Sequence, residues 1–306
     1  MAKYILKRVV AAILTIWVLI TIVFFLVRLM PGEPFTSAKL TPEVKANMEA
    51  YYGFDKPMIV QYGTYMANLL HGDFGYSMKY TNRTVNDLIG ETFPYSADLG
   101  IRGLVMAVSI GLILGIISAR NRGKKIDFFC VIVAVLGTSI PDFIMGAVLQ
   151  YFFGIKWGLF PVARYEGIEY TILPAFALSF YTLASVSRIM RASMLEVTSQ
   201  DYIKTARSKG VSELRITCKH QIRNAIMPVM TVMGPTVASV LTGTFVIESI
   251  FAIPGMGRHY VQSVSNNDYS MVLGMTVFYG IFLVLCNLIV DVLYGVADPR
   301  VRIGKK

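Results

Sequence analysis

Six stretches of the chain carry almost no charge, and each has a length suited to crossing a lipid bilayer. They are residues 9–27, 103–119, 128–155, 170–187, 224–247 and 269–290. An α-helix rises about 1.5 Å per residue, so about 20 residues span the apolar core of a bilayer, which is about 30 Å thick. The stretches lack the alternation of apolar and polar residues that a transmembrane β-barrel requires. The sequence therefore predicts an all-α polytopic membrane protein with six transmembrane helices.

The first stretch has some features of a secretory signal peptide. Lys3, Lys7 and Arg8 form a basic region in front of it. However, the apolar stretch is longer than the usual 7–15 residues, and no small-residue cleavage site follows Arg28. We therefore expect a retained membrane anchor.

Lysine and arginine are distributed unevenly between the segments that join these stretches. Four segments lie on the side of the N-terminus: 1–8, 119–127, 188–223 and 298–306. Three segments lie on the opposite side: 31–95, 155–170 and 251–269. The first group contains 19 of the 29 basic residues, and the second contains 8. Because cytoplasmic loops are enriched in basic residues, we expect both termini to be cytoplasmic. The net charge of +10 then indicates cytoplasmic loops and not a nucleic-acid partner.

Groups that could perform metal or nucleophilic chemistry are sparse and scattered. Cys130, Cys218 and Cys286 are far apart in the sequence, and the three histidines show no metal-ligand spacing. The chain has no G-x-x-x-x-G-K-[S/T] sequence, the phosphate-binding loop of many ATPases. We therefore expect no catalytic residues, no metal site, no cofactor and no ATPase site in this chain.

Residues 31–91 are too long to be a simple connection, and they contain three helix-start patterns. The first is Thr41 followed by a proline, the second begins at Pro57, and the third is capped by Thr84 and runs through Glu91. The sequence predicts a helical insert outside the cell. This insert either covers the ends of the spans or receives a partner protein.

Residues 188–223 form the most basic loop and contain a helix–glycine–helix pattern. Ser199 is a suitable N-cap, Asp201 lies in the first turn, and Gly210 is a suitable left-handed stop. Ser212 then caps a second helix that leads to the next span. Two interpretations are open. The loop is either a solvated basic segment that sets the topology and touches lipid phosphates, or a short helix that inserts into a groove of a partner.

Few polar groups interrupt the predicted spans. Asp142 follows Pro141, which predicts a break in the third span, and the carboxylate either lines a pathway or holds the break. Asp291 lies near the cytoplasmic end of the last span, where we expect a tertiary ion pair. Small residues in the fifth span allow close helix packing. The candidate pathway or hinge residues are Ser139, Pro141, Asp142, Gly234 and Gly243.

Several segments together resemble the permease subunits of ABC importers. Asp201-Tyr-x-x-Thr-Ala-Arg-x-Lys-Gly210, with Ile226 and Pro228 downstream, resembles their "EAA" coupling loop. Its Asp-Tyr form is usual in the oligopeptide, dipeptide and nickel branch. The other matching segments are Arg28-Leu-Met-Pro-Gly-Glu-Pro34, Gly72-Asp-Phe-Gly-Tyr-Ser77, Ile253-Pro-Gly-Met-Gly257, Asn267-Asp-Tyr269 and Asp291-x-x-Tyr-x-x-x-Asp-Pro-Arg300. The resemblance spans residues 1–302 with matching order and spacing.

The resemblance implies a type I importer permease fold and a transport role in a prokaryotic cell membrane. In such importers two homologous permeases pair, and two cytoplasmic ATPases, which bind ATP and magnesium, dock on the coupling helices. A soluble or lipid-anchored binding protein outside the membrane delivers the substrate. This chain resembles the first, oligopeptide-type permease of the pair. The residues expected to contact an ATPase are Asp201, Tyr202, Thr205, Ala206, Arg207, Lys209 and Gly210.

These expectations divide the chain into an N-terminal anchor helix (1–30), an external helical insert (31–91), a permease core of five helices (92–298) and a cytoplasmic tail (299–306). The expected function is half of a translocation pathway for oligopeptides or dipeptides. The alternatives are a secondary transporter or channel without ATPase partners, a permease for nickel chelates or glutathione, and a membrane scaffold. Secondary transporters commonly show inverted repeats and midplane charges, whereas this sequence shows no repeat between its halves and almost no midplane charge.

Overall fold

The computed structural model describes residues 2–29, 51, 53, 56–79, 83–241 and 245–297, and most of them are helical. Within these ranges there is no β-strand, and one isolated bridge joins Tyr76 to Thr84. The helix expected after Thr41, the candidate Gly243 and the tail 299–306 lie outside the described residues.

The helices of the described residues follow in chain order, and η1 and η2 among them are π-helical. They are α1 (Ala2–Arg28), α3 (Met58–Leu70), α4 (Val85–Arg120), α5 (Lys125–Ser139), α6 (Asp142–Leu149), η1 (Gln150–Lys156), α7 (Glu169–Thr198), α8 (Asp201–Ser208), α9 (Glu213–Arg215), η2 (Ile216–Gln221), α10 (Ile222–Ala225), α11 (Met227–Leu241), α12 (Phe245–Ile250), α13 (Met256–Ser265) and α14 (Tyr269–Ala297).

Four helices in the described part of the chain, α1, α4, α7 and α14, are each long and apolar enough to cross a bilayer. Two bent pairs also qualify. One joins α5 to α6 and η1 with a bend of 110°, and the other joins residues 213–225 to α11 with a bend of 50°. Counting each pair as one span gives six spans, as the sequence predicts. Pro141 separates α5 from α6, because proline lacks the amide hydrogen that would continue a helix. The predicted break is therefore confirmed.

Helix α4 is longer than the sequence indicates. Its first turn is fixed by a capping box, in which the Thr84 hydroxyl accepts from the Asp87 amide and the Asp87 carboxylate accepts from the Thr84 amide. The prediction that this helix ends at Glu91 is wrong, since it continues through Pro94 to Arg120. Membrane helices tolerate proline because local adjustments satisfy the freed backbone groups. The boundary expected between 31–91 and 92–298 falls inside this continuous helix.

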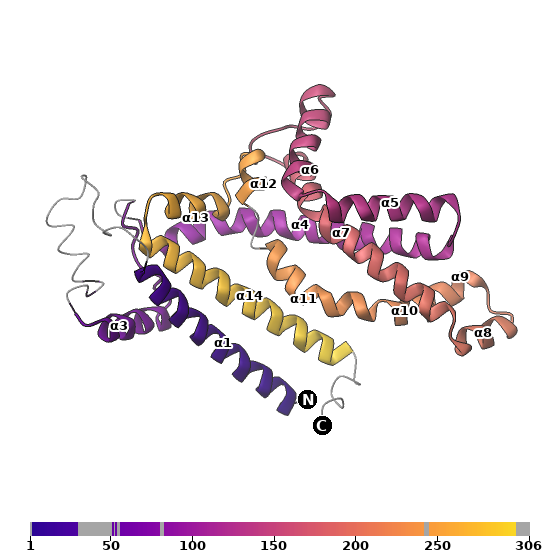
Figure 1. The fold of residues 1–306 in the computed structure, drawn as a ribbon, viewed down its shortest axis with the longest axis horizontal. Helices are drawn as coiled ribbons and strands as arrows, with labels where there is room; N and C mark the ends of the chain where they lie inside the picture. The colour runs from indigo at the N-terminus through magenta and orange to yellow at the C-terminus, as the bar shows by residue number, and fades with distance from the viewer. Residues whose placement is uncertain are drawn as a thin grey trace.

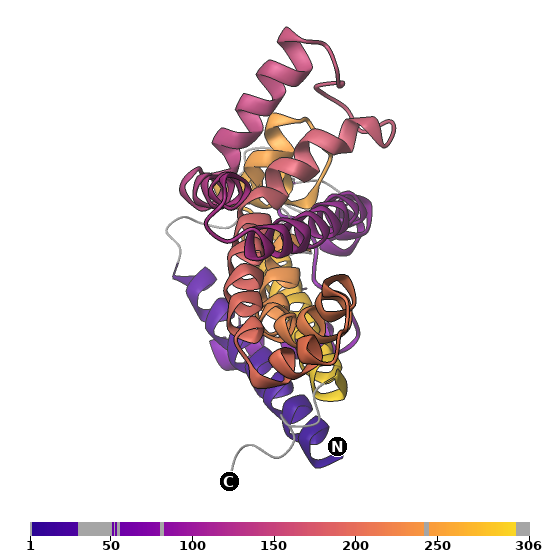
Figure 2. The ribbon, with the colours of Figure 1, turned by 90° about the vertical axis from the view of Figure 1, so that its right-hand side faces the viewer.

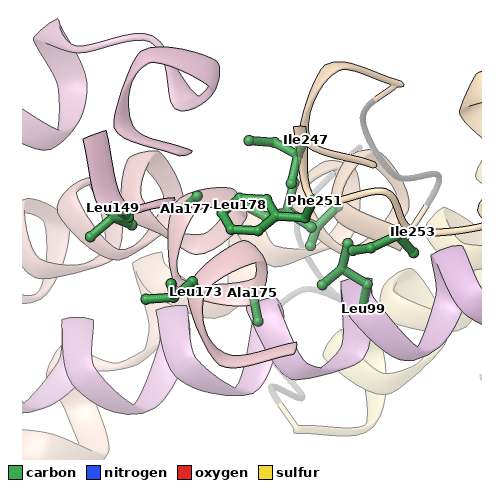
Figure 3. Close-up of a cluster of buried hydrophobic side chains, with 10 residues drawn as sticks. Leu99, Leu149, Leu173, Ala175, Ala177, Leu178, Ile247, Phe251 and Ile253 are labelled. Carbon is green, nitrogen blue, oxygen red and sulfur yellow. The ribbon is translucent and has the colours of Figure 1, made fainter. Parts of the chain in front are cut away.

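Helix α7 is the central helix of the fold and contacts α4, α5, α6 and α11. Glycines bring α4 close to it. A Cβ on Gly115 would lie 2.7 Å from the Met190 Cβ, so no larger residue fits there without a shift. Figure 3 shows the buried cluster around α7, in which Ala177 and Leu178 lie beside Phe251 of the segment after α12.

Helices α1 and α14 lie side by side at the edge of this core (Figure 1). Arg8 and Asp291 form an ion pair with a distance of 2.7 Å, which confirms the tertiary pair predicted for Asp291. At the other end of α1, the Phe24 ring contacts Tyr62 and Tyr65 of α3. Helix α1 therefore packs against α3 at one end and forms an ion pair with α14 at the other.

The two segments that distinguish this chain from a plain helical bundle lie at opposite ends of it. Figure 1 places α3 at one end of the molecule and α8 and α9 at the other. Helix α6 points away from the rest of the molecule in both Figure 1 and Figure 2. The break after α5 thus directs the chain out of the bundle before α7 returns through its centre.

Candidate functional site: the elbow at α8 and the cavity at the α5–α6 break

Helix α8 is a short helix that projects from the end of α7. Together with the turn at Gly210 and helix α9 it forms a segment that we call the elbow. Asp201 lies in its first turn, and Gly210 follows its last turn with a φ of +73°. Residues other than glycine rarely adopt this left-handed conformation, so Gly210 fixes the direction in which the chain continues to α9. The predicted N-cap is wrong. Ser199 ends α7, where its hydroxyl donates to the Glu196 carbonyl, and Gln200 precedes α8.

The faces of α8 differ in exposure. Ile203 is fully buried, and it fixes the helix against η2. Ala206 is half-buried, whereas Tyr202, Thr205 and Lys209 are exposed on the helix and its end. The Tyr202 hydroxyl also accepts a hydrogen bond of 3.2 Å from the Asn224 side chain. The helix therefore rests on the protein along one side and offers the remaining surface to a partner.

Two ion pairs within the chain join charged side chains of the elbow. The Arg207 Nε lies 2.7 Å from a carboxylate oxygen of Glu213, across the turn at Gly210. The Lys204 Nζ lies 2.8 Å from the Asp201 carboxylate. Arg207 thus stabilises the elbow from within, although the sequence suggested it as a contact to an ATPase. All these charges are exposed, so solvent screens both pairs and neither is a major source of stability.

The ion pair between Asp127 and Arg191 is less exposed and lies near the end of α7 from which α8 projects. Asp127, at the start of α5, accepts from Arg191 of α7 at 2.8 Å, from the Ser118 hydroxyl at 2.5 Å and from the Gly123 amide at 2.9 Å. Its side chain is 7% exposed. This arrangement joins the end of α4, the turn after it and α7, two turns before α7 ends.

A cavity of about 390 Å³ opens at the α5–α6 break. Ser139, Pro141 and Asp142 line it together, so three of the candidate pathway residues share one site. The rest of the lining comes from α7 and α11 and includes Tyr181 and Ser239. Leu178 and Val240 also line the cavity, and both belong to the buried cluster of Figure 3. The rigid core of the fold therefore forms part of the cavity wall.

Gly234 is not part of this cavity. It is buried where α11 meets α14, and a Cβ there would lie 3.2 Å from the Asn287 side-chain oxygen and 3.4 Å from Val290. Its position favours close packing of two helices over a role in a pathway.

Buried Glu248 does not stand out in the sequence. It is fully buried in α12, where it accepts from the Ser96 hydroxyl at 2.6 Å and from the Gly257 amide at 2.9 Å. A Cβ on Gly255 would lie 2.3 Å from the Glu248 carboxyl carbon. Burial raises the pKa of Glu248, and its hydrogen bonds oppose this shift. Gly255 and Gly257, which follow α12, are the sequence feature that could have indicated a buried side chain packed against the backbone there.

Asp268 is a second buried carboxylate that does not stand out in the sequence. It accepts from the Ser77 hydroxyl, from the Met78 amide at 3.1 Å and from the Met271 amide at 3.2 Å. It therefore ties the chain before α4 to the start of α14. Both Asp268 and Ser77 lie in segments that carry the resemblance described above, which is the signal that could have joined them.

Comparisons with known proteins agree in their description of the chain. A family model described as "Binding-protein-dependent transport system inner membrane component" matches residues 111–303, and its N-terminal counterpart matches residues 1–100. The dipeptide transport system permease protein DppB of Bacillus subtilis (strain 168) is 45% identical over 307 residues, which cover 100% of both chains. The oligopeptide transport system permease protein OppB of Escherichia coli (strain K12) is 43% identical over 305 residues, which cover 99% of this chain and 100% of the relative.

A solved structure shares the fold. It is titled "Crystal structure of an amino acid ABC transporter with histidines", and the match has a TM-score of 0.54 and 16% sequence identity. The match covers 68% of this chain and 94% of the solved chain. At this level of identity the match supports the arrangement of the helices alone.

Proposed function

Because the chain belongs to the family of binding-protein-dependent transport system inner membrane components, we propose that it forms half of the translocation pathway of an ATP-driven importer for peptides. The chain is a multi-pass membrane protein of the type I permease fold. The peptide substrate is proposed from its full-length relatives, which are named for dipeptide and oligopeptide transport. These names favour peptides over nickel chelates or glutathione, and the family disfavours a secondary transporter or channel.

The elbow at α8 is the observation that carries the coupling mechanism. A transporter driven by separate ATPases needs a firm element that receives their motion. Helix α8 is fixed by buried Ile203, by the Arg207–Glu213 pair and by the left-handed Gly210. We assign contact with an ATPase to exposed Asp201, Tyr202, Thr205 and Lys209 and to half-buried Ala206, with Arg207 and Gly210 holding the geometry.

The remaining partners follow from this role. A second, homologous permease completes the pathway, two ATPases bind ATP and magnesium on the cytoplasmic side, and a binding protein delivers peptide to the opposite face. This chain has no ATPase role of its own in the proposal. The insert that contains α3 lies at the end of the molecule opposite α8, which suits contact with the binding protein.

Substitution of Gly210 tests the coupling role. We expect Gly210→Val to lower ATP-dependent peptide uptake at least about tenfold, because a β-branched residue at this φ re-aims the elbow. Nothing lies within 4 Å of a Cβ at this position, so the effect comes from the backbone and not from a clash. Ala206→Glu should also be severe, and Lys204→Ala should be mild. The assay measures peptide uptake by the reconstituted complex, with its binding protein, and co-purification of the ATPases.

Gly158→Val is the matched control. Gly158 also has a positive φ, of +60°, and also has open space around it, but it lies in the loop after η1. The two variants should therefore carry similar backbone strain and differ in uptake. Normal uptake and normal ATPase binding by both the Gly210 and Ala206 variants would show that α8 is not the coupling helix.

Labelling of single cysteines tests the proposed orientation. In a background that replaces the exposed Cys218, a cysteine at the exposed Glu166 should react with an impermeant reagent from outside the cell. A cysteine at the exposed Ser208 should react only after the membrane is opened. Reaction of both positions from one side would contradict the proposed topology, in which both termini are cytoplasmic.

A further inference from the structure

Asp142 and Arg188 both lie at the cavity of the α5–α6 break, and neither forms an ion pair among the described residues. In the described membrane-spanning helices, the carboxylates of Asp98, Asp127 and Asp291 each have an arginine partner within 2.8 Å. Within the same part of the chain, Asp142 has no ion pair, and its one hydrogen bond is from the amide of its neighbour, Phe143, at 2.9 Å. A carboxylate without a counter-ion in a membrane-spanning segment is costly and marks a functional position.

Arg188 lies at the edge of the same cavity. Its guanidinium donates a hydrogen bond of 2.8 Å to the hydroxyl of Thr138, and Thr138 lines the cavity. Arg188 likewise has no ion pair among the described residues, and its side chain is exposed. The cavity thus has an unneutralised carboxylate in its wall and an unneutralised guanidinium beside it.

The volume of the cavity suits a short peptide. The volume of about 390 Å³ falls in the usual range of small-molecule sites, about 300–1,000 Å³.

We propose that this cavity is a transit site for the two free ends of a peptide, with Asp142 receiving the α-ammonium group and Arg188 receiving the carboxylate. This inference rests on the proposed peptide-import function and adds a specificity determinant within the permease itself. Ser139 and Tyr181 also line the cavity, and their hydroxyl groups suit hydrogen bonds to the peptide backbone between the two ends. A charge-assisted contact at each end distinguishes a peptide from solutes that lack free ends.

Peptide binding to the permease complex without its binding protein tests the assignment. The complex of both permeases and both ATPases, in lipid nanodiscs, is equilibrated with radiolabelled trialanine, N-acetyl-trialanine or trialanine amide. The wild-type complex should bind trialanine at least about tenfold more tightly than either blocked form, because each block removes one charge-assisted contact.

Each variant should change one preference only. Asp142→Asn should weaken trialanine binding about tenfold while leaving N-acetyl-trialanine unchanged, and Asp142→Glu should retain the preference for the free amine. Arg188→Gln should remove the preference against the amide in the same way. Glu166→Gln removes an exposed carboxylate outside the cavity and should leave all three affinities unchanged.

Uptake with the binding protein present separates this inference from the proposed function. Absence of trialanine binding to the wild-type complex, or equal losses for all three peptides in the Asp142 variant, would overturn the transit site even if ATP-driven peptide uptake is normal. Failure of the wild-type complex to take up any peptide would instead overturn the proposed function.

Discussion

Helices α1 and α7 are both apolar enough to cross a membrane, but they use their apolar residues in opposite ways. In α1 only 11% of the apolar window is buried inside the protein, whereas in α7 the share is 67%. Leu6, Ile13 and Leu26 of α1 are each more than half exposed. Helix α1 therefore leaves most of its side chains exposed on the surface of the chain, whereas α7 buries most of them against other helices.

The two helices differ in mean hydropathy, which is 3.0 in the apolar window of α1 and 1.4 in that of α7, and they differ in their small residues. In a bilayer, lipid tails solvate leucine as well as a protein core does, so helices associate through close packing and polar contacts. Helix α7 supplies alanine, serine and threonine along its length and meets glycines of α4 and α5. Three predictions use this contrast, and each compares a position in or against α7 with a control elsewhere in the fold.

The largest expected effect concerns the ion pairs of the two helices. Arg191→Met in α7 should lower the free energy of unfolding by about 3 kcal/mol, because it leaves the nearly buried Asp127 without its counter-ion. Arg8→Met in α1 removes a pair whose side chains are 45% and 35% exposed, and it should cost less than about 1 kcal/mol. Unfolding in mixed detergent micelles measures both. Equal losses would show that the two pairs have similar surroundings.

The next effect concerns the close approach of α4 to α7. Gly115→Val should cost about 2 kcal/mol in the same unfolding assay, since its Cβ would lie 2.7 Å from both the Met190 Cβ and the Ser187 carbonyl oxygen. Gly90→Val is the control on the same helix, where nothing lies within 4 Å. A tolerated Gly115 variant would mean that α4 and α7 separate easily, against the packing described here.

The smallest effect concerns single leucines. Leu183→Ala in α7, where the side chain is 1% exposed, should cost about 1–2 kcal/mol through lost packing. Leu14→Ala in α1, where the side chain is 57% exposed, should stay within about 0.5 kcal/mol. If the Leu14 variant were the more destabilised of the two, α1 would be packed against protein and not against lipid.

The number of spans, the break at Pro141 and the elbow at Gly210 could be predicted because each depends on local chemistry. An uncharged run, a missing amide hydrogen and a left-handed glycine act on their own neighbours in the sequence. The length of α4 could not be predicted in this way. Pro94 suggests that the helix ends near Glu91, but tertiary packing carries it on to Arg120.

Contacts between distant segments were the least accessible from the sequence. Asp142 and Ser139 are close in the chain, but their cavity also needs Tyr181 and Ser239 from other helices. Glu248 follows directly after the fifth apolar stretch of the sequence, and only the fold shows that it is buried and accepts a hydrogen bond from Ser96. Such contacts decide whether a polar group lines a cavity or helps helices to pack. The spacing of apolar residues along the sequence does not encode them.

The uninterrupted course of α4 has a mechanical consequence. Its 36 residues correspond to a rod about 54 Å long, whereas the apolar core of a bilayer is about 30 Å thick. One end is clamped by the capping box at Thr84, and the other ends beside the Asp127–Arg191 pair. A tilt of about 5° around the middle of such a rod displaces each end by about 2 Å in opposite directions. Because α4 continues as one helix through Pro94, it links small displacements at the two faces of the membrane.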